Sequence, residues 1–245
     1  MHPFNWRGWW NFGTGALGDM GCHLIDIPFK ALGLKYPTDV ECSIGTIFTK
    51  MWSADYYPEG CPPSSSVSLH FDATEKNKSP IQMTWSDGGI KPFHPDLLPA
   101  DVSIEDNGVI MIGEKGVITC DSYGNDPKLY LKGEPVIKGE RVRVSEPEFG
   151  HQRLWVDACK AGFNSEEHKS LTSSFDYSGP LTETVLMGNI AIRSYNLEEK
   201  KEGSRRSSYI GRKKLLWDGD NMKIKNLEAA NQFVTRDYRE GWELT

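Results

Sequence analysis

The stretch Val67-Ser68-Leu69-His70-Phe71 alternates apolar and polar residues, and Ile81-Gln82-Met83-Thr84-Trp85 repeats the alternation after a short connection. A period of two is typical of a β-strand with one buried face. Parallel pairing of consecutive strands needs a crossover of about a dozen residues or more. The short connection therefore predicts that these two strands pair antiparallel.

Further strands are predicted on both sides of this pair. They cover residues 40–48, 108–113, 117–121 and 128–132. A short glycine-containing turn joins the second and third of these stretches, which predicts a hairpin. Two long connections, residues 51–65 and 87–100, interrupt the strands. Connections of this length are either binding loops or solvated connectors.

Helical periodicity dominates the rest of the chain. Helices are predicted over residues 16–34, 151–161, 180–195 and 226–239. Thr14 can cap the first helix, and Pro28 is expected to kink it near Ile25. Pro180 is expected at the first position of the third helix. Residues 197–214 are charged and predict an exposed loop. Helices around an antiparallel sheet predict an α+β fold.

Length and charge limit the possible partners. A chain of 245 residues can bury a substantial core and is expected to form one domain, residues 1–245. The net charge is -6 with both signs interspersed, so nucleic acid is not an expected partner. No apolar run approaches the roughly 18 residues of a membrane span, so no membrane partner is expected. The start lacks a signal-peptide pattern, and the compartment, cytoplasmic or periplasmic, stays open.

The cysteines do not predict a disulfide framework or a zinc ribbon. They are odd in number and contain no Cys-x-x-Cys pair. They are Cys22, Cys42, Cys61, Cys120 and Cys159.

The chain contains a letter-for-letter match to the dinucleotide-binding pattern Gly-x-Gly-x-x-Gly, at Gly13-Thr14-Gly15-Ala16-Leu17-Gly18. That loop works after a buried strand, and an acidic residue ends the next strand. Residues such as Asn5 and Asn11 make a poor central strand before it. Asp39, the only acid at the right distance, precedes its predicted strand. We therefore do not interpret the match as a nucleotide-binding loop.

A candidate for proton transfer follows these glycines. Asp19 and His23 are one helical turn apart, and Asp26 follows three residues later, so a helix places all three on roughly one face. An imidazole titrates near neutral pH, and a carboxylate one turn away can orient it. A purely structural hydrogen bond is the alternative. A metal site is not supported, because no second histidine cluster has ligand spacing.

Aromatic residues crowd the first dozen positions. They can line a sugar-binding pocket, although core packing is the alternative. They are Phe4, Trp6, Trp9, Trp10 and Phe12. Among the later histidines, only His94, in the proline-rich loop 87–100, is a candidate substrate contact. His70, His151 and His168 are predicted to be isolated.

Several of these stretches together resemble one protein family. They are Trp6-Arg7, residues 13–26, residues 180–191, Leu216-Trp217-Asp218 and residues 238–242. The set is similar to the C-terminal domain of the Gfo/Idh/MocA oxidoreductases, in the bacterial subgroup whose C-terminal domain is expanded. The resemblance covers nearly the whole chain. The Asp-x-x-x-His pattern in its glycine setting carries most of its specificity.

The resemblance implies an open, mostly antiparallel sheet with helices packed on one face. In the family this domain supplies the substrate pocket and often the oligomer interface, so a homo-oligomer formed through the open sheet is expected. An N-terminal dinucleotide-binding domain holds NAD or NADP in the family, and we expect that domain to be absent from this chain. The family's lysine, in a Glu-Lys-Pro motif of that domain, has no counterpart at Glu114-Lys115-Gly116 or Gly139-Glu140-Arg141.

The resemblance also assigns roles. His23 corresponds to the general acid/base, and Asp19 would position the substrate hydroxyl or the imidazole. Trp6 and Arg7 match a pair that can reach the cofactor. Substrate contacts are expected at Asn11, Trp9, Trp10, Asp26 and His94. The implied activity is NAD(P)-dependent oxidation of a sugar or polyol. The alternatives are an NAD-dependent glycosidase of the same family and a non-catalytic module that binds sugar or forms oligomers.

Overall fold

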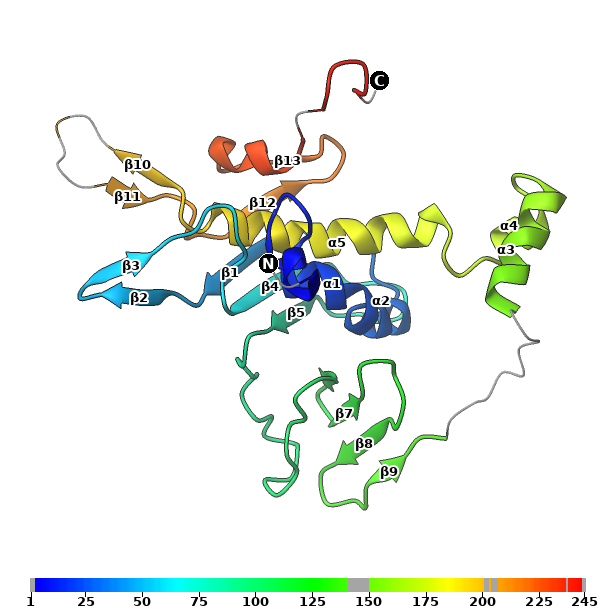
Figure 1. Ribbon diagram of the computed structural model, residues 1–245. Helices are drawn as coiled ribbons and strands as arrows, with labels where there is room; N and C mark the ends of the chain where they lie inside the picture. The colour runs from blue at the N-terminus through cyan, green and yellow to red at the C-terminus, as the bar shows by residue number, and fades with distance from the viewer. Residues whose placement is uncertain (1–2, 141–149, 201–202, 204–206, 237, 244–245) are drawn as a thin grey trace. The chain divides into compact units, whose positions relative to one another are not determined.

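A computed structural model describes residues 3–140, 150–200, 203, 207–236 and 238–243 (Figure 1). The chain divides into two compact units, which we describe separately. Unit 1 comprises Met1–His94 and Thr184–Thr245, and unit 2 comprises Pro95–Glu183. Within the described ranges, no helix is both long and apolar enough to cross a membrane.

Unit 1 is built on a five-stranded sheet in the order β13-β12-β1-β4-β5. Its strands are β1 (Asp39–Ile44), β4 (Ser65–Phe71), β5 (Ile81–Ser86), β12 (Leu215–Asp218) and β13 (Lys223–Ile224). All four neighbouring pairs are antiparallel, and β4 and β5 pair with Leu69 opposite Met83. Val67, Leu69 and Phe71 are buried whereas Ser68 and His70 are half-buried, which confirms the predicted alternation.

Two helical segments pack on the face of this sheet that carries Val67. They are α1 (Gly15–Leu24) and the part of α5 (Phe175–Ser194) that belongs to unit 1. The close approach is made at Gly188, where an added Cβ would lie 2.4 Å from Leu17 Cδ2 and 3.3 Å from Val67 Cγ1. Leu17 and Val67 are both buried, so the packing of α1, α5 and β4 forms the centre of the core.

The helix predicted over residues 16–34 is two helices. After α1 the chain breaks at Ile25, as the sequence predicted, and α2 (Asp26–Leu32) follows. Pro28 lies in the first turn of α2, where its missing N–H has no partner inside the helix. Gly33, with φ of 65°, ends α2 in the left-handed conformation that glycine adopts without strain.

Two hairpins lie where the sequence predicted loops. β2 (Ile47–Lys50) begins at the end of the expected strand 40–48. It pairs with β3 (Ser53–Asp55), which lies inside the expected connection 51–65. β10 (Glu198–Lys200) and β11 (Ser207–Tyr209) pair within residues 197–214, of which 201–202 and 204–206 lie outside the described residues. Most of its described residues are exposed, as predicted, but the prediction that it is a loop is wrong because it contains two strands.

The last predicted helix is also wrong. Of residues 226–239, the described ones contain only a 3-10 helix, η2 (Glu228–Phe233), and residue 237 lies outside the described residues. Asparagine side chains bind the neighbouring strands instead: Asn231 Oδ1 accepts from Ile224 N at 2.7 Å, and Asn226 Oδ1 accepts from Leu216 N at 2.9 Å. Such side-chain bonds to the backbone compete with α-helix formation.

Unit 2 holds a four-stranded antiparallel sheet in the order β6-β7-β8-β9. Val117, Tyr130 and Leu98 form its buried core. The strands are β6 (Val109–Ile112), β7 (Gly116–Cys120), β8 (Lys128–Leu131) and β9 (Ile137–Lys138), and the helices are α3 (Gly150–Ala161), α4 (Glu166–Lys169) and the start of α5. The hairpin at β6 and β7 was predicted.

The prediction for the start of α5 is wrong, because the helix begins at Phe175 and Pro180 lies inside it. Its first turn is already closed before the proline, since Ser178 N donates to Ser174 O at 2.8 Å. A proline there removes one helical hydrogen bond without ending the helix. Helices combined with open antiparallel sheets give the predicted α+β class.

Candidate functional site

The N-terminal segment and α1 meet through one ion pair. Residues Pro3–Gly8 form a 3-10 helix, η1, and the Arg7 guanidinium binds the Asp19 carboxylate of α1. The two side chains are 34% and 44% exposed, so solvent reaches both. The pair therefore joins two stretches that the sequence assigned to one site. Asp19 is oriented by Arg7 from outside its own helix.

His23 lies one turn after Asp19 on α1 and is exposed. Asp26 begins α2 and is half-buried. Because Asp19 and His23 are four residues apart within one regular helix, both lie on the same face. Across the part of the chain that the structure describes, no group of three or more His, Cys, Asp or Glu side chains is placed to hold a metal ion.

The N-terminal aromatic residues divide between surface and packing. Trp6 and Phe12 stack with ring centroids 6.2 Å apart, and both are more than half exposed. Trp9 is 40% exposed and forms an isolated bridge with Gly60. Trp10 is half-buried against Arg193 of α5. The exposed rings can face a ligand, whereas Trp10 serves the packing of this segment.

The glycine-rich stretch is explained by local packing. It follows η1 and a loop, so the strand that a dinucleotide-binding loop requires is replaced by 3-10 structure. A Cβ on Gly13 would lie 2.4 Å from Arg7 O, which shows how closely the chain folds back on itself. Gly15 has φ of 68°, and a Cβ there would lie 2.8 Å from Cys61 Sγ. Glycine at position 13 lets the chain pass close to Arg7 of η1, and glycine at position 15 lets α1 begin close to Cys61.

The remaining predicted contacts lie apart in the chain. Asn11 is exposed in the loop between η1 and α1. His94 is exposed at the end of the connection that follows β5, where unit 1 ends. Of the predicted site residues, the structure therefore joins Arg7 to Asp19 and places His23 and Asn11 on the same N-terminal part of unit 1.

One charged cluster was not predicted. His70 Nδ1 lies 2.6 Å from Asp39 Oδ1, and Lys214 Nζ lies 3.2 Å from the same oxygen. Thr38 Oγ1 donates to Asp39 Oδ2 at 3.0 Å. The prediction that His70 is isolated is therefore wrong, because the antiparallel register of β1 and β4 places Asp39 opposite His70. Only the strand pairing could have revealed this cluster.

Burial and hydrogen bonding act in opposite directions on Asp39. Burial raises the pKa of its carboxyl group, but hydrogen bonds from Thr38, His70 and Lys214 favour the charged form and together hold that pKa below 3.8. The carboxylate side chain is only 14% exposed. The cluster therefore keeps the Asp39 carboxylate negatively charged at one end of the sheet.

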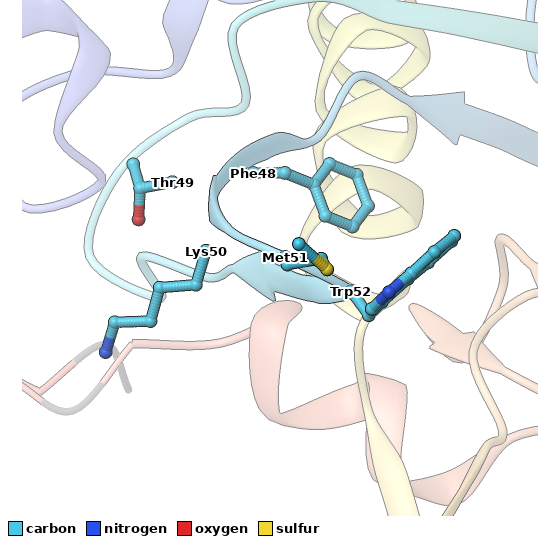
Figure 2. Close-up of a pocket in the computed structure, with 5 residues that line it drawn as sticks. All are labelled: Phe48, Thr49, Lys50, Met51 and Trp52. Atoms are coloured by element: carbon cyan, nitrogen blue, oxygen red, sulfur yellow. The ribbon is translucent and has the colours of Figure 1, made fainter.

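A shallow pocket of about 480 Å³ lies elsewhere, at the tip of the β2–β3 hairpin. Figure 2 shows Phe48, Met51 and Trp52 gathered on one side of the hairpin while Lys50 points away. Trp52 is 93% exposed. All of the lining side chains come from this one hairpin, so the pocket contains none of the predicted site residues.

Cys42 and Cys61 are not activated nucleophiles. All five cysteines are free thiols. Burial raises the pKa of Cys42 to about 12 and that of Cys61 to about 11, and nearby Asp87 adds to the effect at Cys61. A thiol with a raised pKa carries little thiolate at neutral pH.

No protein-family model and no curated protein matches this chain.

Proposed function

We propose that this chain supplies the substrate-binding and proton-transfer part of an NAD(P)-dependent oxidoreductase that acts on a hydroxyl of a sugar or polyol. The observation that carries the proposal is the Arg7–Asp19 pair. It links the Trp6-Arg7 segment to the helix of Asp19 and His23, and both are among the stretches that carry the family resemblance. Arg7, Asp19, His23 and Trp6 are all accessible from solvent.

Arg7 and Trp6 are residue types that can bind such a cofactor. An arginine binds pyrophosphate oxygens well, and the exposed ring of Trp6 offers a flat apolar face. NAD or NADP, held mainly by a nucleotide-binding domain, supplies the hydride acceptor. Arg7 would contact the cofactor only if its pair with Asp19 opens. An ion pair between exposed groups is weak enough to do so.

The chemistry at the chain's own residues is a proton transfer. His23 accepts the proton of the substrate hydroxyl as the carbon–oxygen bond becomes a carbonyl and the hydride leaves the same carbon. Asp19, one helical turn before His23 on α1, accepts a hydrogen bond from a substrate hydroxyl and fixes its position relative to His23. Aromatic surface from Trp6 and Phe12 packs against the apolar face of a sugar ring.

The test uses the gene product that carries this chain, with NAD or NADP and a panel of sugars and polyols. His23→Asn is expected to lower kcat by about a hundredfold or more, as loss of a general base does. The control is His151→Asn, because His151 is exposed on α3 in unit 2. Equal kcat in the wild type and His23→Asn would overturn the proposal. Sugar release from a glycoside without net NADH would support the glycosidase instead.

A further inference from the structure

A second polar cluster lies on α5, at residues that were not predicted to belong to a site. Arg193 is partly buried, and its guanidinium carbon lies 5.5 Å from the ring centre of Trp10 and 4.4 Å from that of Phe233. The rings come from the N-terminal loop and from η2, so three separate segments position this one side chain. An arginine held in this way has lost most of its freedom and can be aimed at a ligand.

Arg193 is surrounded by groups that do not neutralise it. Burial lowers the pKa of its guanidinium, and the positive charge of Arg236 lowers it further. The other groups that shift this pKa are Tyr56 and Cys61, neither of which is a carboxylate. Among the described residues, no carboxylate forms an ion pair with Arg193. Two guanidinium groups whose charges act on each other favour a bound anion when, as here among the described residues, Arg193 has no carboxylate in an ion pair.

One turn earlier on the same helix lies a buried amide without partners. Asn189 is 5% exposed, and among the described residues neither its Oδ1 nor its Nδ2 has a hydrogen-bond partner. Residues 189 and 193 are four apart and therefore share one face of α5. Leu186, on the same stripe, is 42% exposed, so Asn189 lies between two positions that reach solvent. Buried polar groups in native proteins are almost always paired, so this amide calls for an explanation.

We propose that Asn189 and Arg193 form a binding site for a small hydroxy acid. The carboxylate accepts hydrogen bonds from the planar guanidinium of Arg193, and Arg236 adds positive charge. A hydroxyl group satisfies Asn189, because it can donate to Oδ1 and accept from Nδ2 at once. Sulfate, which carries no O–H group at neutral pH, would leave Oδ1 without a donor, and a neutral sugar would leave both guanidinium groups without an acid.

The proposal is tested on the whole 245-residue chain with three probes at constant ionic strength. Gluconate carries a carboxylate and hydroxyls, glucose carries hydroxyls alone, and inorganic sulfate carries charge without any hydroxyl. Gluconate is expected to raise Tm and to shift the side-chain amide NMR signals of Asn189, with an affinity at least about tenfold above that of the other two probes. Equal binding of sulfate, or no binding of gluconate, would overturn the proposal.

Two variants and one matched control locate the binding. Arg193→Gln and Asn189→Leu are each expected to weaken gluconate binding at least about tenfold. The control is Arg212→Gln, because Arg212 also lies over two aromatic rings, Tyr195 at 4.8 Å and Tyr209 at 3.5 Å, but donates to Asn196 Oδ1 at 3.1 Å. Arg212→Gln should bind gluconate as the wild type does.

Asn189→Leu also separates a ligand site from a defect in packing. It replaces an unpartnered amide by an apolar side chain of similar size, so Tm without ligand should not fall, while the gluconate-induced shift should disappear. Unchanged gluconate binding in this variant would overturn the role of Asn189. If Arg193→Gln does not fold, the amide shifts of the wild type still decide the question. His23→Asn should bind gluconate normally, because binding here requires neither His23 nor Asp19.

Discussion

Asp19 and Asp39 are both carboxylates paired with basic side chains, but their surroundings differ. Asp19 is 44% exposed and pairs with Arg7 across the surface of α1. Asp39 is 14% exposed and is held by His70, Lys214 and Thr38 at the end of the sheet. An exposed pair contributes little stability and opens easily, whereas a partly buried cluster stabilises the fold. The exposed pair is suited to meet a ligand, and the buried cluster to hold the sheet.

The largest expected difference is in the free energy of unfolding. Asp39→Ala removes the acceptor shared by His70, Lys214 and Thr38, and should lower the free energy of unfolding by about 2 kcal/mol. Asp19→Ala is the matched control and should lower it by less than about 1 kcal/mol. Urea denaturation of both variants measures the two values. Equal losses would show that burial does not distinguish these carboxylates.

Acid should remove the contribution of Asp39. Its pKa in the folded chain lies below 3.8, so its stabilising effect is fully present above the unfolded pKa and is lost as the pH falls through the folded value. The stability advantage of the wild type over Asp39→Asn should therefore be present at pH 5 and shrink below about pH 4. Denaturation curves across this range measure it. A difference that persists unchanged at pH 2 would contradict the assignment.

The smallest effect is expected at Arg7. A double-mutant cycle with Arg7→Ala and Asp19→Ala should give a coupling energy of about 0.2–1 kcal/mol, as for exposed ion pairs generally. Because both groups are exposed, raising the salt concentration to about 1 M should weaken the coupling. A coupling above about 2 kcal/mol that ignores salt would mean that the pair is desolvated, and that Arg7 is not available to a cofactor.

Local patterns predicted the fold best. The alternation at Val67–Phe71 and the break at Ile25 depend on neighbouring residues, and both are present in the structure. The predicted helix over residues 226–239 failed because Asn226 and Asn231 bind strands that precede them in the chain. Pro180 was misplaced because proline is tolerated inside a helix whose first turn is already closed. The error at residues 226–239 therefore arose because contacts with distant strands override the local preference for a helix.

The site divides in the same way. Helical spacing predicted that Asp19 and His23 share a face of α1, because the spacing is a property of one helix. The partner of Asp19 could not be predicted, since it depends on how η1 folds back against α1. The contact of His70 with Asp39 depends on strand register. Arg193 and Asn189 could have been noticed as an i, i+4 polar pair in residues 185–193, which are otherwise apolar or glycine.

The strand order of unit 1 has a consequence during biosynthesis. β1 pairs with β4 on one side and with β12 on the other, and β12 follows all of unit 2 in the sequence. While the nascent chain emerges, one edge of β1 stays unpaired until its partner strand β12, which begins at Leu215, has been synthesised. Unpaired strand edges recruit other chains and cause aggregation. Chains truncated before Leu215 should therefore aggregate during translation, which sedimentation of stalled ribosome complexes can measure.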